Sequence, residues 1–322
     1  MEASVAGHAI AEIAEGLFRF DTGYVRPSHT ACYLVVEDGR AAIIDTGVPA
    51  AVPALLDTLD AVGIPRHAVE RVIPTHVHLD HAGGAAALMA ALPQARLGVH
   101  PSGVQHMADP AQLEAGVRAL YGDAYFEAEY APLRPIDRER IDSLEDGAVV
   151  QVGTRKLEIV HTPGHAWHHF SVLDRRADTL IAGDAFGAGY PGFGASGAPF
   201  MVPVVPPPQF KPEAYSKTLA RIVALAPGQI APAHFPLIDD VAGTAHRLEA
   251  MLDAGIEAAR AAESVTDLEA RLLAVWADWL PTGIDPDAYR NAYGLDIWLT
   301  AEGMWMWRQK QERKRGEVAY HG

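Results

Sequence analysis

Hydrophobic and polar residues alternate near the start of the chain and then change to a helical spacing. The alternation predicts three strands, at residues 16–24, 31–36 and 41–44. The dipeptide Asp38-Gly39 suits the tight turn between the last two strands. A helical period follows, with apolar positions at Leu55, Leu56, Leu59 and Val62. The first half then continues with a strand at 71–75, a helix at 84–92 and a strand at 95–100.

Short apolar runs return in the second half of the chain. They predict four more strands, at residues 148–152, 157–161, 170–173 and 179–182. Each half up to about residue 235 therefore has strands followed by helices, which predicts an α/β (α+β) fold built as a four-layer αββα sandwich. Residues 187–208 are rich in glycine and proline, and we expect a long functional loop there.

Two segments stand outside this alternation. Residues 243–322 have helical spacing throughout, with Thr266 and Glu269 suited to a capping box at the start of one helix. Residues 101–140 are rich in aromatic residues, among them Tyr121, Tyr125 and Tyr130. This insert either covers a substrate pocket or forms a small core of its own.

The densest group of polar residues is the run Thr75-His76-Val77-His78-Leu79-Asp80-His81-Ala82-Gly83-Gly84. His76 and His78 are two positions apart, so at the end of a strand both imidazoles point to one side. Asp80 and His81 lie in the turn that follows, and the two glycines let the backbone bend before the next helix. Four potential ligands so close together predict a metal site.

One turn cannot complete two coordination shells, so further ligands must come from later parts of the chain. Three later apolar runs each end on a suitable residue: His165, Asp184 and His234. Other histidines are expected to be structural. If His168 and His169 lie on a strand, one of them faces the site layer and the other points away.

These motifs, together with Asp45-Thr46-Gly47, resemble those of the metallo-β-lactamase-fold superfamily over roughly residues 15–240. The resemblance implies a metal-dependent hydrolase, with a catalytic domain at 1–242. We expect the helical C-terminal region at 243–322 to pack on that domain, because its helices are amphipathic and no Gly/Ser-rich linker precedes them. It assigns His76, His78 and His165 to a first metal ion. It assigns Asp80, His81 and His234 to a second ion, with Asp184 bridging the two. Asp45 matches a buried aspartate that supports the ligands.

Histidine and carboxylate ligands suit two divalent ions, with zinc expected and iron or manganese as alternatives. Two such ions can share a hydroxide that attacks a carbonyl group. Asp80 is the expected catalytic residue, because it contacts both metal and solvent and can pass a proton to the leaving group. Tyr190, in the predicted loop after Asp184, is a candidate for a hydrogen bond to the substrate carbonyl.

Composition narrows the range of partners. The chain has 26 Lys and Arg against 41 Asp and Glu, a formal charge of −15, which disfavours nucleic acids and anionic membranes as partners. The single cysteine, Cys32, excludes a disulfide within the chain. The start of the chain has no basic segment like that of a secretory signal, and no apolar run is long enough for a bilayer. We expect a cytoplasmic protein that acts on a small molecule and is a possible homodimer.

Several branches of the superfamily remain open at this level. Asp184 stands where common β-lactamases place a cysteine, which argues against a β-lactamase. Thioester hydrolases of the glyoxalase II kind and acyl-homoserine lactonases are closer, and the favoured substrate is a small ester, lactone or thioester. The alternatives are a mononuclear iron oxidoreductase similar to persulfide dioxygenases, and a binding or sensor protein without catalysis.

Overall fold

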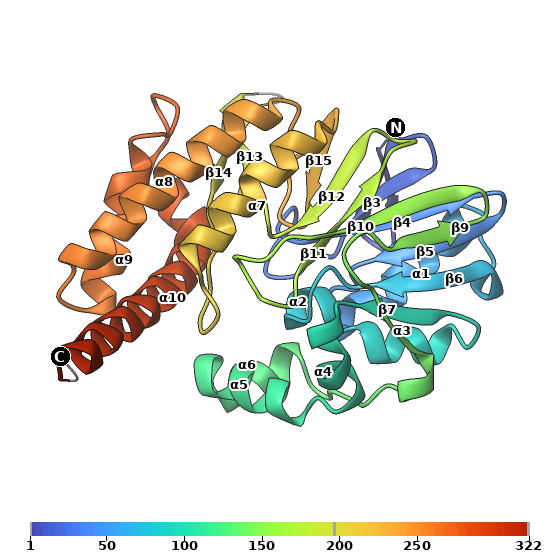
Figure 1. Cartoon of the computed structure of the whole chain (residues 1–322). Helices are drawn as coiled ribbons and strands as arrows, with labels where there is room; N and C mark the ends of the chain where they lie inside the picture. The colour runs from blue at the N-terminus through green and yellow to red at the C-terminus, as the bar shows by residue number, and fades with distance from the viewer. Residues whose placement is uncertain (1, 196–197, 321–322) are drawn as a thin grey trace. The chain divides into compact units, whose positions relative to one another are not determined.

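The structure is a computed structural model that describes residues 2–195 and 198–320 (Figure 1). The chain divides into two compact units. The first unit comprises Met1–His161, His168–Gly183 and Ala233–Phe235, and the second comprises Thr162–Trp167, Asp184–Pro232 and Pro236–Gly322. The domain boundary expected at residue 242 stays a prediction.

The first unit contains an eight-stranded sheet whose strands follow chain order. The strands are β1 (Glu2–Val5), β2 (His8–Ala14), β3 (Leu17–Asp21), β4 (Ala31–Glu37), β5 (Arg40–Ile44), β6 (Val69–Ile73), β7 (Arg96–Val99) and β8 (Ile141–Ser143). Pairing is antiparallel from β1 to β5 and parallel from β5 to β8. The predicted strands up to residue 100 are confirmed, whereas β1 and β2 were not predicted.

Two helices cover one face of this sheet. They are α1 (Val52–Ala61) and α3 (Ala85–Ala91), and both link parallel strands (Figure 1). Their apolar faces share one core with the sheet, in which Leu55, Leu59 and Leu88 pack beside Ile43 and Val72. The predicted helices at 55–62 and 84–92 are therefore confirmed, because burial against the sheet stabilises the apolar stripe that the sequence displays.

A second sheet of the first unit runs in the order β12, β11, β10, β9. Its strands are β9 (Val149–Val152), β10 (Arg155–His161), β11 (Phe170–Asp174) and β12 (Thr179–Gly183), all antiparallel. Every residue of β11 and β12 is buried, as expected for strands covered on both faces. All four predicted strands are confirmed.

The aromatic insert forms a satellite core in the first unit. It contains α4 (Val104–Ala108), α5 (Ala111–Tyr121) and α6 (Asp123–Glu129). Phe126 and Tyr130 pack with Tyr24, Val48 and Leu79. The Tyr24 hydroxyl forms a hydrogen bond with the Tyr130 hydroxyl. It forms a second one with the Tyr125 hydroxyl, at 2.9 Å. The insert's second expected role, to cover a substrate pocket, stays a prediction.

The second unit contains a β-hairpin where a long loop was predicted, so that prediction is wrong. β13 (Ala188–Ala195) pairs with β14 (Ala198–Val202). The rings of Tyr190, Phe193 and Phe200 surround Tyr293, at centroid distances of 4.9, 5.2 and 5.3 Å. The Tyr293 hydroxyl also donates to the Phe200 carbonyl at 3.0 Å. This packing comes from a residue about a hundred positions away, so the local glycine and proline content could not reveal it.

The rest of the second unit is mainly helical. It contains α7 (Pro212–Leu225), β15 (Gln229–Pro232), α8 (Val241–Ala261), α9 (Val265–Ala277) and α10 (Pro286–Tyr320). The predicted helical character of the C-terminal region is confirmed over its described residues. The capping box predicted at Thr266 is wrong. Instead Ser264 Oγ accepts the Asp267 amide at 3.1 Å, and Asp267 Oδ2 accepts the Glu263 amide at 2.9 Å.

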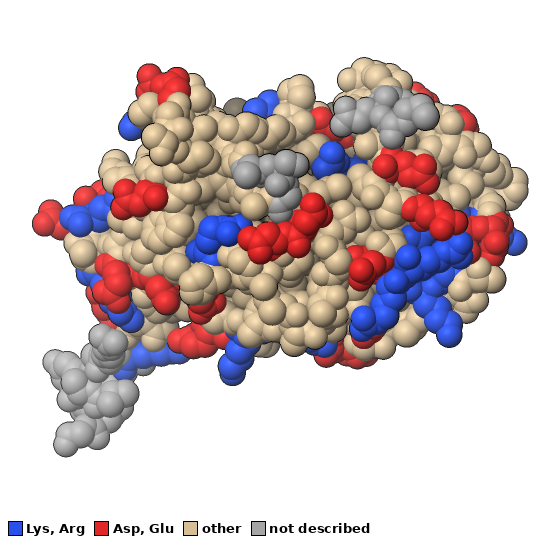
Figure 2. All heavy atoms as spheres, turned by 90° about the horizontal axis from the view of Figure 1, so that it is seen from above, with Lys and Arg blue, Asp and Glu red and all other residues tan. Residues whose placement is uncertain are grey.

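Within residues 2–195 and 198–320 there are also four single turns of 3₁₀-helix, at Pro49–Ala51, Arg66–Ala68, Pro101–Gly103 and Arg138–Arg140. Among the described residues, no helix is both long and apolar enough to cross a membrane. On the face seen in Figure 2, acidic side chains are spread widely and several basic side chains gather in one patch at the right. Basic side chains also pair with acidic neighbours. Arg71 and Arg96, for example, both donate to the carboxylate of Asp142.

Candidate metal centre

The histidine-rich run lies in the first unit, between β6 and α3. Its middle forms the short helix α2 (Leu79–Ala82). His76 and His81 are buried, and His76 Nε2 lies 2.9 Å from His78 Nδ1. At Gly84, a Cβ would lie 2.7 Å from Val52 and 2.8 Å from the Thr46 carbonyl oxygen. Only glycine fits at this position, which explains why the histidine-rich run ends with a glycine.

Asp80, His81 and His234 form one compact group in the first unit. Their potential ligand atoms all lie within 4.8 Å of one another. Asp80 Oδ2 is 3.1 Å from His81 Nε2 and 3.5 Å from His234 Nε2. Burial alone would raise the pKa of the Asp80 carboxyl, but His81 and His234 outweigh burial and hold this pKa well below its usual value. A carboxylate and two imidazole nitrogens thus converge on one point, as a cation site requires.

His81 and His234 are each held in place through the other nitrogen of the ring. His81 Nδ1 lies 3.2 Å from Asp45 Oδ2. His234 Nδ1 lies 2.9 Å from the backbone oxygen of His29. An Nδ1–H that donates to a fixed oxygen leaves the lone pair on Nε2, which is the nitrogen that faces Asp80. The ring orientation therefore matches that of metal-binding histidines.

Asp45 is fully buried and lies at the centre of these contacts. Its φ of 61° is in the left-handed region, which residues other than glycine rarely adopt. Oδ1 accepts the Thr75 amide at 2.7 Å and the Thr75 hydroxyl at 3.0 Å, while Oδ2 accepts from His81. This placement agrees with a role in supporting the ligands.

Asp45→Asn is expected to weaken metal binding ~10- to 100-fold, the usual effect of losing such a support. The new amide NH₂ would donate to His81 Nδ1 and force the ring proton onto Nε2, which then cannot bind a cation. Competition with a chromophoric chelator measures the affinity. Asp57→Asn, on the exposed side of α1, is the matched control. Equal affinity in both variants would remove Asp45 from the centre.

His165 and Asp184, the two other predicted ligands, lie in the second unit and face each other there. His165 Nε2 is 3.3 Å from Asp184 Oδ2, and both side chains are buried. His165 Nδ1 lies 2.8 Å from the Val204 backbone oxygen, the same anchoring as in the first unit. Gly164 permits the turn, because a Cβ there would lie 2.5 Å from the Tyr215 Cα and its φ is 139°.

Tyr190, the predicted substrate contact, is buried in the second unit. Its hydroxyl donates to Asp296 Oδ2 at 2.7 Å. The proposed contact with substrate stays untested, and it has no part in the function proposed below.

Two anchors of the predicted ligands could not be identified from the sequence. His29 and Val204 contribute backbone oxygens, which carry no signal in the residue type. His168 and His169 precede β11, so the expectation that strand alternation separates them is wrong. Both rings approach His76, with centroid distances of 6.2 and 4.8 Å. The two adjacent histidines were the sequence signal for these contacts. The strand-based prediction for them was wrong because the segment is a turn and β11 begins after it.

A family model described as the metallo-beta-lactamase superfamily matches residues 25–234. The chain belongs to the metallo-beta-lactamase superfamily. The match spans all seven predicted ligands, and it confirms the expected superfamily and the α+β fold class. The described residues include groups of His and Asp that are able to bind a metal ion. Asp80, His81 and His234 form one such group.

Two relatives and one further solved structure indicate the range of this superfamily. The metallo-beta-lactamase fold-containing protein ST1585 of Sulfurisphaera tokodaii is 26% identical over 230 residues, which cover 69% of this chain and 79% of that protein. Its crystal structure has a TM-score of 0.66 at 22% identity and covers 90% of this chain and 98% of that one. The acyl-coenzyme A thioesterase MBLAC2 of Gallus gallus is 26% identical over 198 residues, covering 53% of this chain and 63% of that protein.

A peroxy diiron species of the chemotaxis sensor ODP has a TM-score of 0.52 at 15% identity, over 75% of this chain and 94% of that one. At this identity the likeness shows the fold alone. A shared fold does not determine the reaction, which must be argued from the site.

Proposed function

We propose that this protein is a dinuclear metal-dependent hydrolase of a small ester, lactone or thioester. The observation that carries the proposal is the group of Asp80, His81 and His234, in which both imidazoles are anchored through Nδ1 and direct Nε2 at one carboxylate. The superfamily pattern adds His76, His78, His165 and Asp184 to the ligand set. Zinc is the proposed metal, because anchored imidazoles and carboxylates suit it.

The side chains divide the work. When bound, the metal ions supply a hydroxide nucleophile at neutral pH and polarise the substrate carbonyl. The buried imidazoles hold the ions in position. Asp80 is the proposed proton carrier, because its side chain is 22% exposed while His81 is fully buried. It can take a proton from the nucleophile and release it to the leaving oxygen or sulfur.

The name of one relative favours a thioester within this substrate range. MBLAC2 is an acyl-coenzyme A thioesterase, and its match includes more than half of this chain. An oxidoreductase similar to persulfide dioxygenases is the competing proposal, and a diiron protein has a similar fold. A mononuclear oxygenase needs only three protein ligands and has no chemical use for a second set. We therefore favour the hydrolase.

Metal content and reaction type test the proposal together. We expect two metal ions per chain by elemental mass spectrometry, and fewer in His234→Ala. His246→Ala changes an exposed histidine of α8 and is the matched control, with unchanged metal content.

The zinc-loaded protein is then assayed with thioesters, lactones and simple esters, and the iron-loaded protein with persulfides in an oxygen electrode. Hydrolysis of at least one ester class is the expected result. Substrate-dependent oxygen uptake without any hydrolysis would replace the hydrolase by the oxidoreductase.

A further inference from the structure

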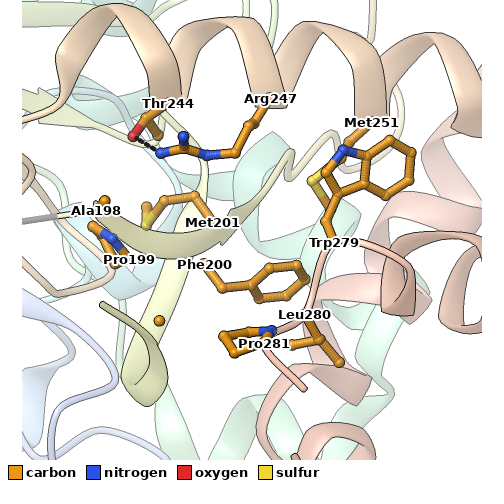
Figure 3. A pocket seen from close by; sticks show the side chains of 11 residues that line it. Ala198, Pro199, Phe200, Met201, Thr244, Arg247, Met251, Trp279, Leu280 and Pro281 are labelled. Atoms are coloured by element: carbon orange, nitrogen blue, oxygen red, sulfur yellow. Dashed lines mark hydrogen bonds between the residues drawn. The ribbon is translucent and has the colours of Figure 1, made fainter. Parts of the chain in front are cut away.

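The second unit contains a cavity that the proposed reaction does not use. Its volume is about 270 Å³, and it is partly open to solvent. The β13–β14 hairpin, helix α8 and the segment after α9 form its walls (Figure 3). None of the predicted metal ligands lies among the lining residues. The cavity is therefore a separate feature whose chemistry can be considered independently.

Most of the lining is apolar and suits a flat, unsaturated group. The side chains of Phe200, Met201, Met251, Trp279, Leu280 and Pro281 face the cavity (Figure 3). Met251 and Met201 are buried beneath it, while Trp279 and Leu280 are only half-buried. Aromatic rings and thioethers favour contact with another aromatic ring. Burial of such a ring would cover apolar surface that now faces solvent.

Arg247, on α8, is the one cationic group of the lining, and its position is fixed. Nη2 donates to Thr244 Oγ1 at 2.7 Å, and Nη1 donates to Asp240 Oδ2 at 3.2 Å. A guanidinium group has five N–H donors, so these two bonds leave others for a ligand. Its side chain is 36% exposed, which keeps the charge accessible at the edge of the apolar wall.

Asp240 does not cancel this charge entirely. Its Oδ1 accepts the Gly243 amide at 3.0 Å and caps the start of α8. The carboxylate is thus shared between the helix end and Arg247, and it touches only one edge of the guanidinium. A planar carboxylate matches the remaining donors of a guanidinium better than a neutral or cationic group does.

We propose that this cavity binds a small aromatic carboxylate. The ring lies against Phe200 and Trp279, and the carboxylate accepts from Arg247. The volume lies below the usual range for drug-sized ligands, so the cavity has room for one ring with a short acid chain. The protein then has a ligand site besides its metal centre, and this inference holds whether or not the proposed hydrolase activity is correct.

The test is calorimetric titration of the full-length protein with 3-phenylpropionate. We expect saturable binding, weaker binding of the uncharged 3-phenylpropanol, and about 10- to 100-fold loss of affinity in Arg247→Gln, the range for a charged hydrogen bond. Arg260→Gln is the matched control, since Arg260 lies on the same helix, pairs with Glu257 and is absent from the cavity lining. It should bind as the unchanged protein does.

A second titration, after dialysis against a chelator, separates this cavity from the metal centre. Equal affinity is expected. Loss of binding on chelation would place the carboxylate on a metal ion instead and overturn the proposal. So would undiminished binding in Arg247→Gln, or no binding at millimolar ligand. A dimer that Trp279→Ala dissociates would assign the cavity to a second copy of the chain.

Discussion

Asp80→Asn is expected to lower kcat by about 10²- to 10⁴-fold, the usual contribution of a positioned proton carrier. The asparagine oxygen can still face the cation, so metal content should change little. What the variant loses is the ability to accept a proton. His81 and His234 hold the pKa of Asp80 below its usual value, so the side chain is an ionised carboxylate at neutral pH and can face a cation.

Three measurements separate this effect from simpler ones. Circular dichroism checks the fold, elemental analysis checks metal content, and turnover of the best thioester or lactone gives kcat. Asp60→Asn, on the exposed side of α1, is the matched control and should keep full activity. Unchanged turnover in Asp80→Asn would exclude Asp80 from the mechanism, and loss of metal would reassign it to binding alone.

Arg155→Met is expected to lower the free energy of unfolding by about 3–5 kcal/mol, the cost of breaking a buried ion pair from one side. Arg155 and Asp174 are both fully buried and lie on neighbouring strands of the second sheet. The guanidinium contacts Asp174 Oδ2 at 2.6 and 2.7 Å and donates to the Glu15 backbone oxygen at 2.8 Å. Methionine fills the space but leaves the Asp174 charge without its partner.

Urea unfolding followed by circular dichroism measures this change. Arg175→Met is the control, because Arg175 pairs with Glu158 at 3.4 Å on the surface, where such pairs contribute ~0–1 kcal/mol. Asp174 also accepts hydrogen bonds from the backbone amides of Arg176 and Ala177. If Arg155→Met lowers the free energy of unfolding by less than about 1 kcal/mol, these amides are sufficient to stabilise the Asp174 carboxylate.

The sequence signal for the predicted metal ligands is largely local. His76, His78, Asp80 and His81 are close together in the chain, and each later candidate follows an apolar strand. Strand ends are where a β-sheet presents polar groups, so an apolar run followed by His or Asp carries information about position. The structure brings Asp80 and His81 to His234 despite the long separation along the chain.

The features that the sequence could not predict depend on distant partners. The hairpin at 188–202 is stabilised by Tyr293, and the start of α9 is set by Ser264 and Asp267 rather than by an equally plausible pair two residues later. The anchors of His165 and His234 are backbone oxygens, which every residue type has. Each of these features depends on tertiary packing, which cannot be inferred from the local composition of the sequence.

The anchored histidines also bear on how the protein matures. In a zinc finger the ligands are disordered until the ion arrives, so folding waits for metal. Here the Nδ1 atoms of His81, His165 and His234 are held by protein oxygens that need no ion. We therefore expect the chain to complete its fold without metal and to bind the proposed ions afterwards. Starvation for metal should leave an inactive but intact protein that recovers on resupply, without new synthesis.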